Sequence, residues 1–282
     1  MTSVVGIALG FVLGAVLLRI FENRFIFFPL RYPDGFEPPE KYGLRVEEVW
    51  LTTEDGVRIN AWYLPNSATS KVILMFHGNA VNLGFDLARL QALARLGANL
   101  FEVDYRGYGK SEGTPNEAGV YRDAEAAYRY LVEAKRHQPR DIFVYGQSLG
   151  GAVAVELASR HECGGLIVES SFTCARAMAR RMFLIPGFEY LPKSRFDSLR
   201  KIARVRAPIL VVHGDQDDVI PFSMGQRLYE AAPKPKSFFP VAGAGHNNVF
   251  LVGGEAYFER LRNFLGVASP APAPAATSKK SL

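Results

Sequence analysis

The hydrophobic and polar residues of this chain alternate in blocks that predict strands and helices in turn. Val46 to Leu51 and Val57 to Leu64 flank the turn at 54–56, a pattern typical of two paired strands. Lys71 to Phe76 is a continuous apolar run, as in a strand covered on both faces. Later blocks predict strands at 99–103, 142–145, 165–168, 208–212 and 236–240, and helices at 85–96, 117–135, 151–158, 223–231 and 255–265. This alternation predicts an α/β fold with a mostly parallel sheet and helices on both faces.

The N-terminal residues follow a different pattern. The run from Val4 to Leu18 is apolar, and no charge precedes Arg19. With Ile20 and Phe21 it reaches the minimum of about 17 residues that crosses a bilayer. Arg19, Arg24 and Arg31 all follow the run, so the positive-inside rule predicts a single-pass anchor with the rest of the chain in the cytoplasm.

Two other interpretations of this run stay open. A secretory signal peptide would need a positive N-terminal region and a cleavage site, neither of which is clear. A helix folded into the core is the other. Phe25 to Pro29 follows the run and is interpreted as a collar at the membrane interface. We expect an anchor and collar at residues 1–28, a folded domain at 29–266, and a disordered Pro/Ala-rich tail at 267–282.

Composition excludes few function classes but favours one domain. The chain has 282 residues, of which 48% are hydrophobic, which is enough for one full core. Its net charge of +5 is modest and no nucleic-acid-binding motif is visible, so we expect no nucleic-acid partner. Cys163 and Cys174 lack the spacing of a metal or redox site. We therefore expect no metal and no cofactor.

The pentapeptide Gly146 to Gly150 is the most informative motif. It has the form G-x-S-x-G, with an apolar strand before it and a helical segment after it. A nucleophile elbow needs tiny residues at both glycine positions, because strand and helix approach closely around a strained serine. Such a pentapeptide arises by chance in roughly one chain in ten, and the flanking elements make it specific. The motif predicts that Ser148 is a catalytic nucleophile.

A serine nucleophile needs a base, and the base needs an acid. In an α/β sheet with this elbow the partners follow in the order serine, acid, histidine, at the C-terminal ends of later strands. An acidic turn with Asp215, Asp217 and Asp218 follows the strand at 208–212. His246 lies in a glycine-rich loop after the last strand. The order Ser148, Asp217, His246 fits this requirement.

With these motifs the chain resembles membrane-anchored α/β-hydrolase-domain proteins, a family that includes bud-emergence-type proteins, protein depalmitoylases and monoacylglycerol or lysophospholipid lipases. The resemblance runs from Phe27 to Leu265. It rests on the elbow and on four further motifs, which are 76–80 (FHGNA), 104–113 (DYRGYGKSEG), 213–221 (HGxxDxxxP) and 245–247 (GHN). It implies an α/β-hydrolase fold with a small cap and a catalytic domain at 29–266.

The resemblance also implies roles for single residues. It makes Asp217 the triad acid and assigns the backbone N–H of Asn79 to the oxyanion hole. The N–H of Leu149, at the start of the elbow helix, is the second donor, and each donor would stabilise an oxyanion by roughly 3 kcal/mol. His77 is expected to order this loop. Glu169 follows the predicted strand at 165–168, which precedes the strand that leads to the acidic turn. It remains an alternative acid, since some related hydrolases take their acid from the end of that earlier strand.

The substrate is predicted from the anchor and the cap. The cap lies between Ser170 and Pro208 and includes the apolar, basic stretch 178–188. This composition suits an anionic membrane surface, although a helix packed on the sheet would look similar. We expect a membrane-anchored serine hydrolase of acyl esters or thioesters, with a small-molecule or lipid acyl substrate. The alternatives are a serine peptidase or amidase of the same fold, or a catalytically idle interaction protein.

Overall fold

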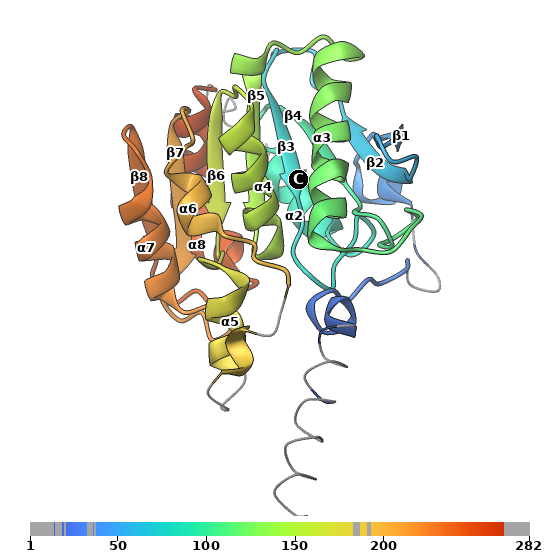
Figure 1. Ribbon diagram of the computed structural model, residues 1–282. Coiled ribbons are helices and arrows are strands. Elements are labelled where there is room, and N and C mark those ends of the chain that lie inside the picture. The colour runs from blue at the N-terminus through green and yellow to red at the C-terminus, as the bar shows by residue number, and fades with distance from the viewer. Residues whose placement is uncertain are drawn as a thin grey trace, which may run out of the picture.

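The continuous apolar runs form the middle of an eight-stranded sheet. The computed structural model describes residues 14, 19, 21–32, 36, 38–182, 187–190 and 193–267. In these residues the strand order is β1-β2-β4-β3-β5-β6-β7-β8 (Figure 1). Strands β1 and β2 pair antiparallel to each other, β2 pairs antiparallel to β4, and all other pairs are parallel. The strands are β1 (Glu47–Thr52), β2 (Arg58–Leu64), β3 (Val72–Phe76), β4 (Asn99–Val103), β5 (Ile142–Gln147), β6 (Gly165–Glu169), β7 (Ile209–Gly214) and β8 (Lys236–Val241).

Helices cover both faces of the sheet, as the alternating pattern predicted. Buried residues of α3, α4, α6 and α7 pack into one apolar cluster, and those of α2 and α8 into a second cluster on the opposite face (Figure 1). The helices are α2 (Leu87–Ala94), α3 (Glu117–Glu133), α4 (Leu149–Arg160), α5 (Ala175–Met182), α6 (Ser198–Ile202), α7 (Phe222–Ala231) and α8 (Val249–Leu265), with short 3-10 turns η1 (Pro39–Tyr42), η2 (Pro139–Asp141) and η3 (Phe188–Tyr190).

The last helix begins earlier than the sequence predicted. The sequence analysis predicted this helix at residues 255–265. The structure starts α8 at Val249 and breaks its regular backbone at Gly254, where φ is 50° and ψ is −141°. Val249 and Phe250 are buried in the second cluster. Packing of these two side chains accounts for the additional helical turn.

The N-terminal segment, defined here as residues 21–28, packs on the domain. Residues 21–26 are helical. Phe27 is 1% exposed and meets the ring of Phe196 edge-on at 6.0 Å. The predicted anchor falls mostly on residues outside the described part of the chain, and so does the predicted tail from residue 268. Within the described part, no helix combines the length and the apolar character needed to span a bilayer.

Candidate active site

The elbow serine lies between β5 and α4 in a strained conformation. Ser148 has φ 56° and ψ −117°, a region that residues with side chains rarely adopt. A Cβ on Gly146 would lie 2.1 Å from the carbonyl oxygen of Gly150. A Cβ on Gly150 would lie 1.9 Å from the carbonyl oxygen of Phe76 in β3. Close backbone contact therefore requires glycine at both positions. The turn between β5 and α4 then presents the serine at the C-terminal edge of the sheet.

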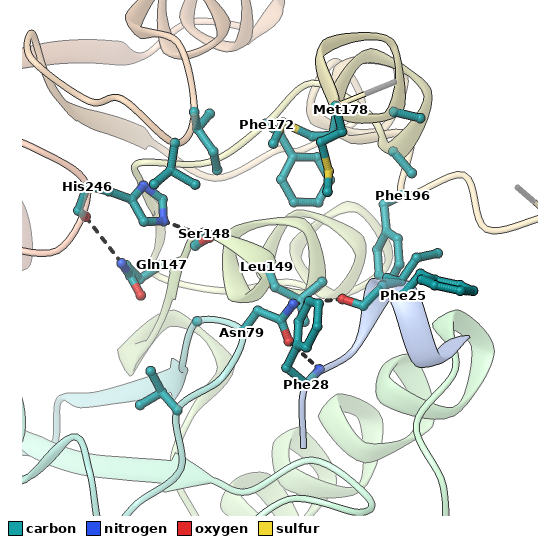
Figure 2. Close-up of a pocket in the computed structure, with 18 of the residues that line it drawn as sticks. Phe25, Phe28, Asn79, Gln147, Ser148, Leu149, Phe172, Met178, Phe196 and His246 are labelled. Atoms are coloured by element: carbon teal, nitrogen blue, oxygen red, sulfur yellow. Dashed lines mark hydrogen bonds between the residues drawn. The ribbon is translucent and has the colours of Figure 1, made fainter. Parts of the chain in front are cut away.

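Three side chains from distant parts of the sequence form one chain of hydrogen bonds. Ser148 Oγ lies 3.0 Å from His246 Nε2, as drawn in Figure 2, and His246 Nδ1 lies 2.8 Å from Asp217 Oδ2. The Asp217 side chain is fully buried and that of His246 is 9% exposed. An imidazole protonated on Nδ1 donates to the aspartate and accepts the serine proton at Nε2. This arrangement can activate a serine hydroxyl.

The carboxylate of Asp217 has further donors. Its Oδ1 accepts the backbone N–H groups of Val219 at 3.0 Å and Ile220 at 2.7 Å. Its Oδ2 lies 3.3 Å from His213 Nε2, a contact that the sequence analysis missed. Burial works to raise the pKa of Asp217, but hydrogen bonds from His213, His246 and the Ile220 N–H outweigh it and hold that pKa below the usual range. The carboxylate is therefore ionised under ordinary conditions.

The other candidate acids make different contacts. The Glu169 carboxylate is fully buried, lies 2.6 Å from Arg89 Nη1 and accepts a tyrosine hydroxyl from α8 at 2.7 Å. Asp215 and Asp218 are exposed. Of the acids considered, the structure brings Asp217 into contact with the imidazole.

The predicted oxyanion residues line the same pocket as the serine. Asn79 and Leu149 both border the cavity that contains Ser148. Leu149 is the first residue of α4, where backbone N–H groups have no partner inside the helix. A Cβ on Gly78 would lie 3.6 Å from Ser148 Cβ and 2.5 Å from Gln147 Oε1. The glycine therefore lets the loop approach the nucleophile, and the two N–H groups can serve a carbonyl oxygen bound there.

The buried side chain of His77 contacts the loop at residues 78–79. It is 2% exposed, its Nδ1 lies 2.8 Å from the carbonyl oxygen of Gly78, and its Nε2 lies 3.5 Å from Asp104 Oδ1. Its ring packs against Tyr105 and Tyr108, with centroids 4.4 and 5.4 Å away. These contacts fit the expected ordering role.

An apolar cavity of about 570 Å³ opens above the serine. Residues 78–79, 147–149 and 246–247 form its floor and supply most of its polar groups. The cap and the following loop contribute Phe172, Ala175, Met178, Ala179, Met182 and Phe196, several of which Figure 2 shows. The N-terminal segment contributes Glu22, Phe25, Ile26 and Phe28, which the sequence analysis missed. No local pattern indicates that contribution, since these residues precede the elbow by more than a hundred positions. In the described residues, no three His, Cys, Asp or Glu side chains cluster in a way that could hold a metal.

Comparison with known proteins identifies the family to which this chain belongs. Residues 67–188 match the family described as "Serine aminopeptidase, S33". The chain is 37% identical over 225 residues to alpha/beta hydrolase domain-containing protein 17B of Homo sapiens, covering 77% of this chain and 75% of that protein. It is 34% identical over 247 residues to the uncharacterized protein Rv2307c of Mycobacterium tuberculosis, covering 86% of this chain and 87% of that protein.

Solved structures agree on the fold. The esterase Pf2001 of Pyrococcus furiosus superposes with a TM-score of 0.71 at 22% identity, covering 84% of this chain and 98% of that chain. The chain belongs to the α/β-hydrolase family. Within that family it is a serine hydrolase.

Proposed function

We propose that this protein is a membrane-anchored serine hydrolase that cleaves acyl ester or thioester bonds through Ser148, His246 and Asp217. The observation that carries the proposal is the continuous hydrogen-bond chain of these three side chains at the polar floor of an apolar cavity. A polar reaction centre beneath an apolar chamber suits a substrate with one reactive carbonyl and a hydrocarbon tail.

The reaction proceeds in two half-reactions. His246 Nε2 takes the Ser148 proton while Oγ attacks the acyl carbonyl, and the N–H groups of Asn79 and Leu149 stabilise the oxyanion. The imidazolium then gives its proton to the leaving alcohol or thiol, which departs and leaves an acyl-serine. A water molecule repeats the sequence, releasing the fatty acid and restoring the serine. Asp217 fixes the imidazole and stabilises its charged form.

The size and apolar character of the cavity favour a substrate with an acyl chain. Its volume of about 570 Å³ lies within the range of small-molecule sites. Each methylene group that moves from water into such an apolar space gains about 0.8 kcal/mol. The resemblance of the sequence motifs to those of depalmitoylases and monoacylglycerol lipases favours thioesters and lipid esters.

The membrane assignment rests on both sequence and surface. We propose an anchor and collar at residues 1–28, a cytoplasmic catalytic domain at 29–266 and a tail at 267–282. Beside the cavity, Phe25, Phe28 and Met182 are 55%, 50% and 64% exposed, and Arg180 and Arg181 lie on the same helix as Met182. Exposed aromatic and basic side chains together favour an anionic bilayer surface.

A peptidase is the second candidate, favoured by the family match at residues 67–188. An aminopeptidase needs a free carboxylate for the substrate ammonium group. Glu22 is the acid in the cavity lining, and both of its oxygens already accept hydrogen bonds from residues 193–194. Matched ester, thioester and anilide substrates with one acyl group distinguish the candidates, and we expect turnover of the ester and thioester well above that of the anilide.

Replacing Ser148 by Ala tests the nucleophile. We expect Ser148→Ala to abolish labelling by a fluorophosphonate probe and to lower kcat by several orders of magnitude, because the covalent intermediate cannot form. Ser159→Ala, on the helix α4 that follows Ser148, is the control and should label like the wild type. Persistent labelling of Ser148→Ala would refute the assignment.

A further inference from the structure

The N-terminal segment is a wall of the cavity as well as a connection to the predicted anchor. Phe25 and Phe28 line the cavity, and Figure 2 shows Phe28 beside Asn79 and Leu149. Both rings are about half exposed, at 55% and 50%, whereas Phe27 between them is 1% exposed. Phe27 therefore stabilises the core. The two exposed rings add little to the core and border an open apolar space.

A buried carboxylate holds this wall against the cap. Glu22 is 9% exposed. It accepts the backbone N–H of Ser194 at 3.0 Å, the hydroxyl of the same residue at 2.8 Å, and the N–H of Lys193. These contacts join the start of the N-terminal segment to the loop that follows the cap helix α5.

The C-terminal end of the N-terminal segment is held by Asn79, in the loop that follows β3. Asn79 Nδ2 donates to the carbonyl oxygen of Ile26 at 2.7 Å, and its Oδ1 accepts the N–H of Phe28 at 3.0 Å (Figure 2). The Tyr108 hydroxyl donates to the same Oδ1 at 2.7 Å. The residue whose backbone is proposed to stabilise the oxyanion thus positions the wall with its side chain.

We propose that Phe25 and Phe28 determine the acyl-chain length that the enzyme accepts, with Glu22 as the positioning residue that holds them against the cap. The inference rests on the proposed acyl-hydrolase function and adds a specificity element to it. A short acyl group reaches only the floor near Ser148. A longer chain must run past these two rings, and each methylene that they cover gains roughly fourfold in kcat/KM.

A chain-length series of p-nitrophenyl esters, from two to twelve carbons and below their micelle concentrations, tests this. We expect Phe28→Ala and Phe25→Ala to stay within about twofold of wild type on the two-carbon ester. On the ten- and twelve-carbon esters kcat/KM should fall about tenfold or more, mainly through a higher KM, since roughly two methylenes lose their cover. Glu22→Ala should show the same length-dependent loss, and Glu22→Gln, which keeps one acceptor oxygen, should recover part of it.

Phe21→Ala is the matched control. Phe21 lies on the same helical stretch as Phe25 and is 42% exposed, but it is outside the cavity lining. It should leave the whole series unchanged. Equal losses at every chain length, or an unchanged series in both lining variants, would overturn the inference while wild-type turnover still supports the hydrolase. Absence of wild-type turnover on every ester, with no fluorophosphonate labelling, would instead overturn the proposed function and this inference with it.

Discussion

At Asp217, donors from two histidines and two backbone N–H groups converge on one buried carboxylate. The sequence order located an acidic turn, and a family resemblance was needed to choose among its three aspartates. The structure shows a physical difference, because Asp217 is buried while Asp215 and Asp218 are exposed. Contact with His213 could not be predicted, since it depends on how the turn folds back over the strand end.

The substitution Asp217→Asn should act on both rate and stability. We expect kcat to fall roughly 10⁴-fold, because an amide at this position no longer selects the productive imidazole tautomer. The native pKa of Asp217 is lowered, so its ionised form stabilises the fold above the unfolded pKa of about 3.9, and this stabilisation is lost as pH falls through the native value. The Tm difference between wild type and variant should therefore be largest at neutral pH and shrink from pH 5 to pH 3.

The neighbouring substitution Asp218→Asn is the control for this experiment. Its side chain is exposed in the same turn, so both kcat and the pH profile of Tm should follow the wild type. Near wild-type turnover of Asp217→Asn, together with collapse of activity in Glu169→Gln, would transfer the acid role to Glu169.

Among the elements, the elbow was predictable and the N-terminal wall was not. Strand, serine and helix are adjacent in sequence, and their glycine spacing is imposed by contacts within a few residues and with β3. The wall instead depends on hydrogen bonds between Phe28 and Asn79, which lie 51 positions apart, and between Glu22 and Ser194, which lie 172 positions apart. A periodicity read within one element carries no information about such partners.

The elbow makes a testable claim about packing. In Gly150→Ala, the new methyl group meets the backbone carbonyl of Phe76, which cannot rotate away as a side chain could. We expect α4 to be displaced from β3, at a cost of about 1–3 kcal/mol and a drop in Tm of roughly 2–12 °C. Fluorophosphonate labelling should fall with it, since the serine moves. Ser159→Ala, further along α4, should keep both, and a Gly150→Ala variant with wild-type Tm and labelling would contradict the close contact.

On the scale of the whole molecule, the reactive centre, the cap and the N-terminal segment lie at one end. Figure 1 shows α5 and the described N-terminal residues below the same edge of the sheet. Exposed apolar side chains of the cap and the N-terminal segment surround the cavity there. A chain anchored through its N terminus would therefore hold this end close to the bilayer, so that an acyl chain could pass from lipid to cavity over a short path.

Deleting residues 1–20 separates anchoring from catalysis. This deletion removes the predicted anchor and keeps the N-terminal segment, so turnover of a short soluble ester should stay within about twofold of the full chain. Turnover of a long-chain acyl substrate in anionic vesicles should fall about tenfold or more, because the enzyme is no longer concentrated at the surface that holds the substrate. Fusing an unrelated transmembrane helix to residue 21 should restore the vesicle activity. Equal effects on both substrates, or digestion of the catalytic domain by protease added outside intact cells, would contradict the proposed link between anchor and substrate.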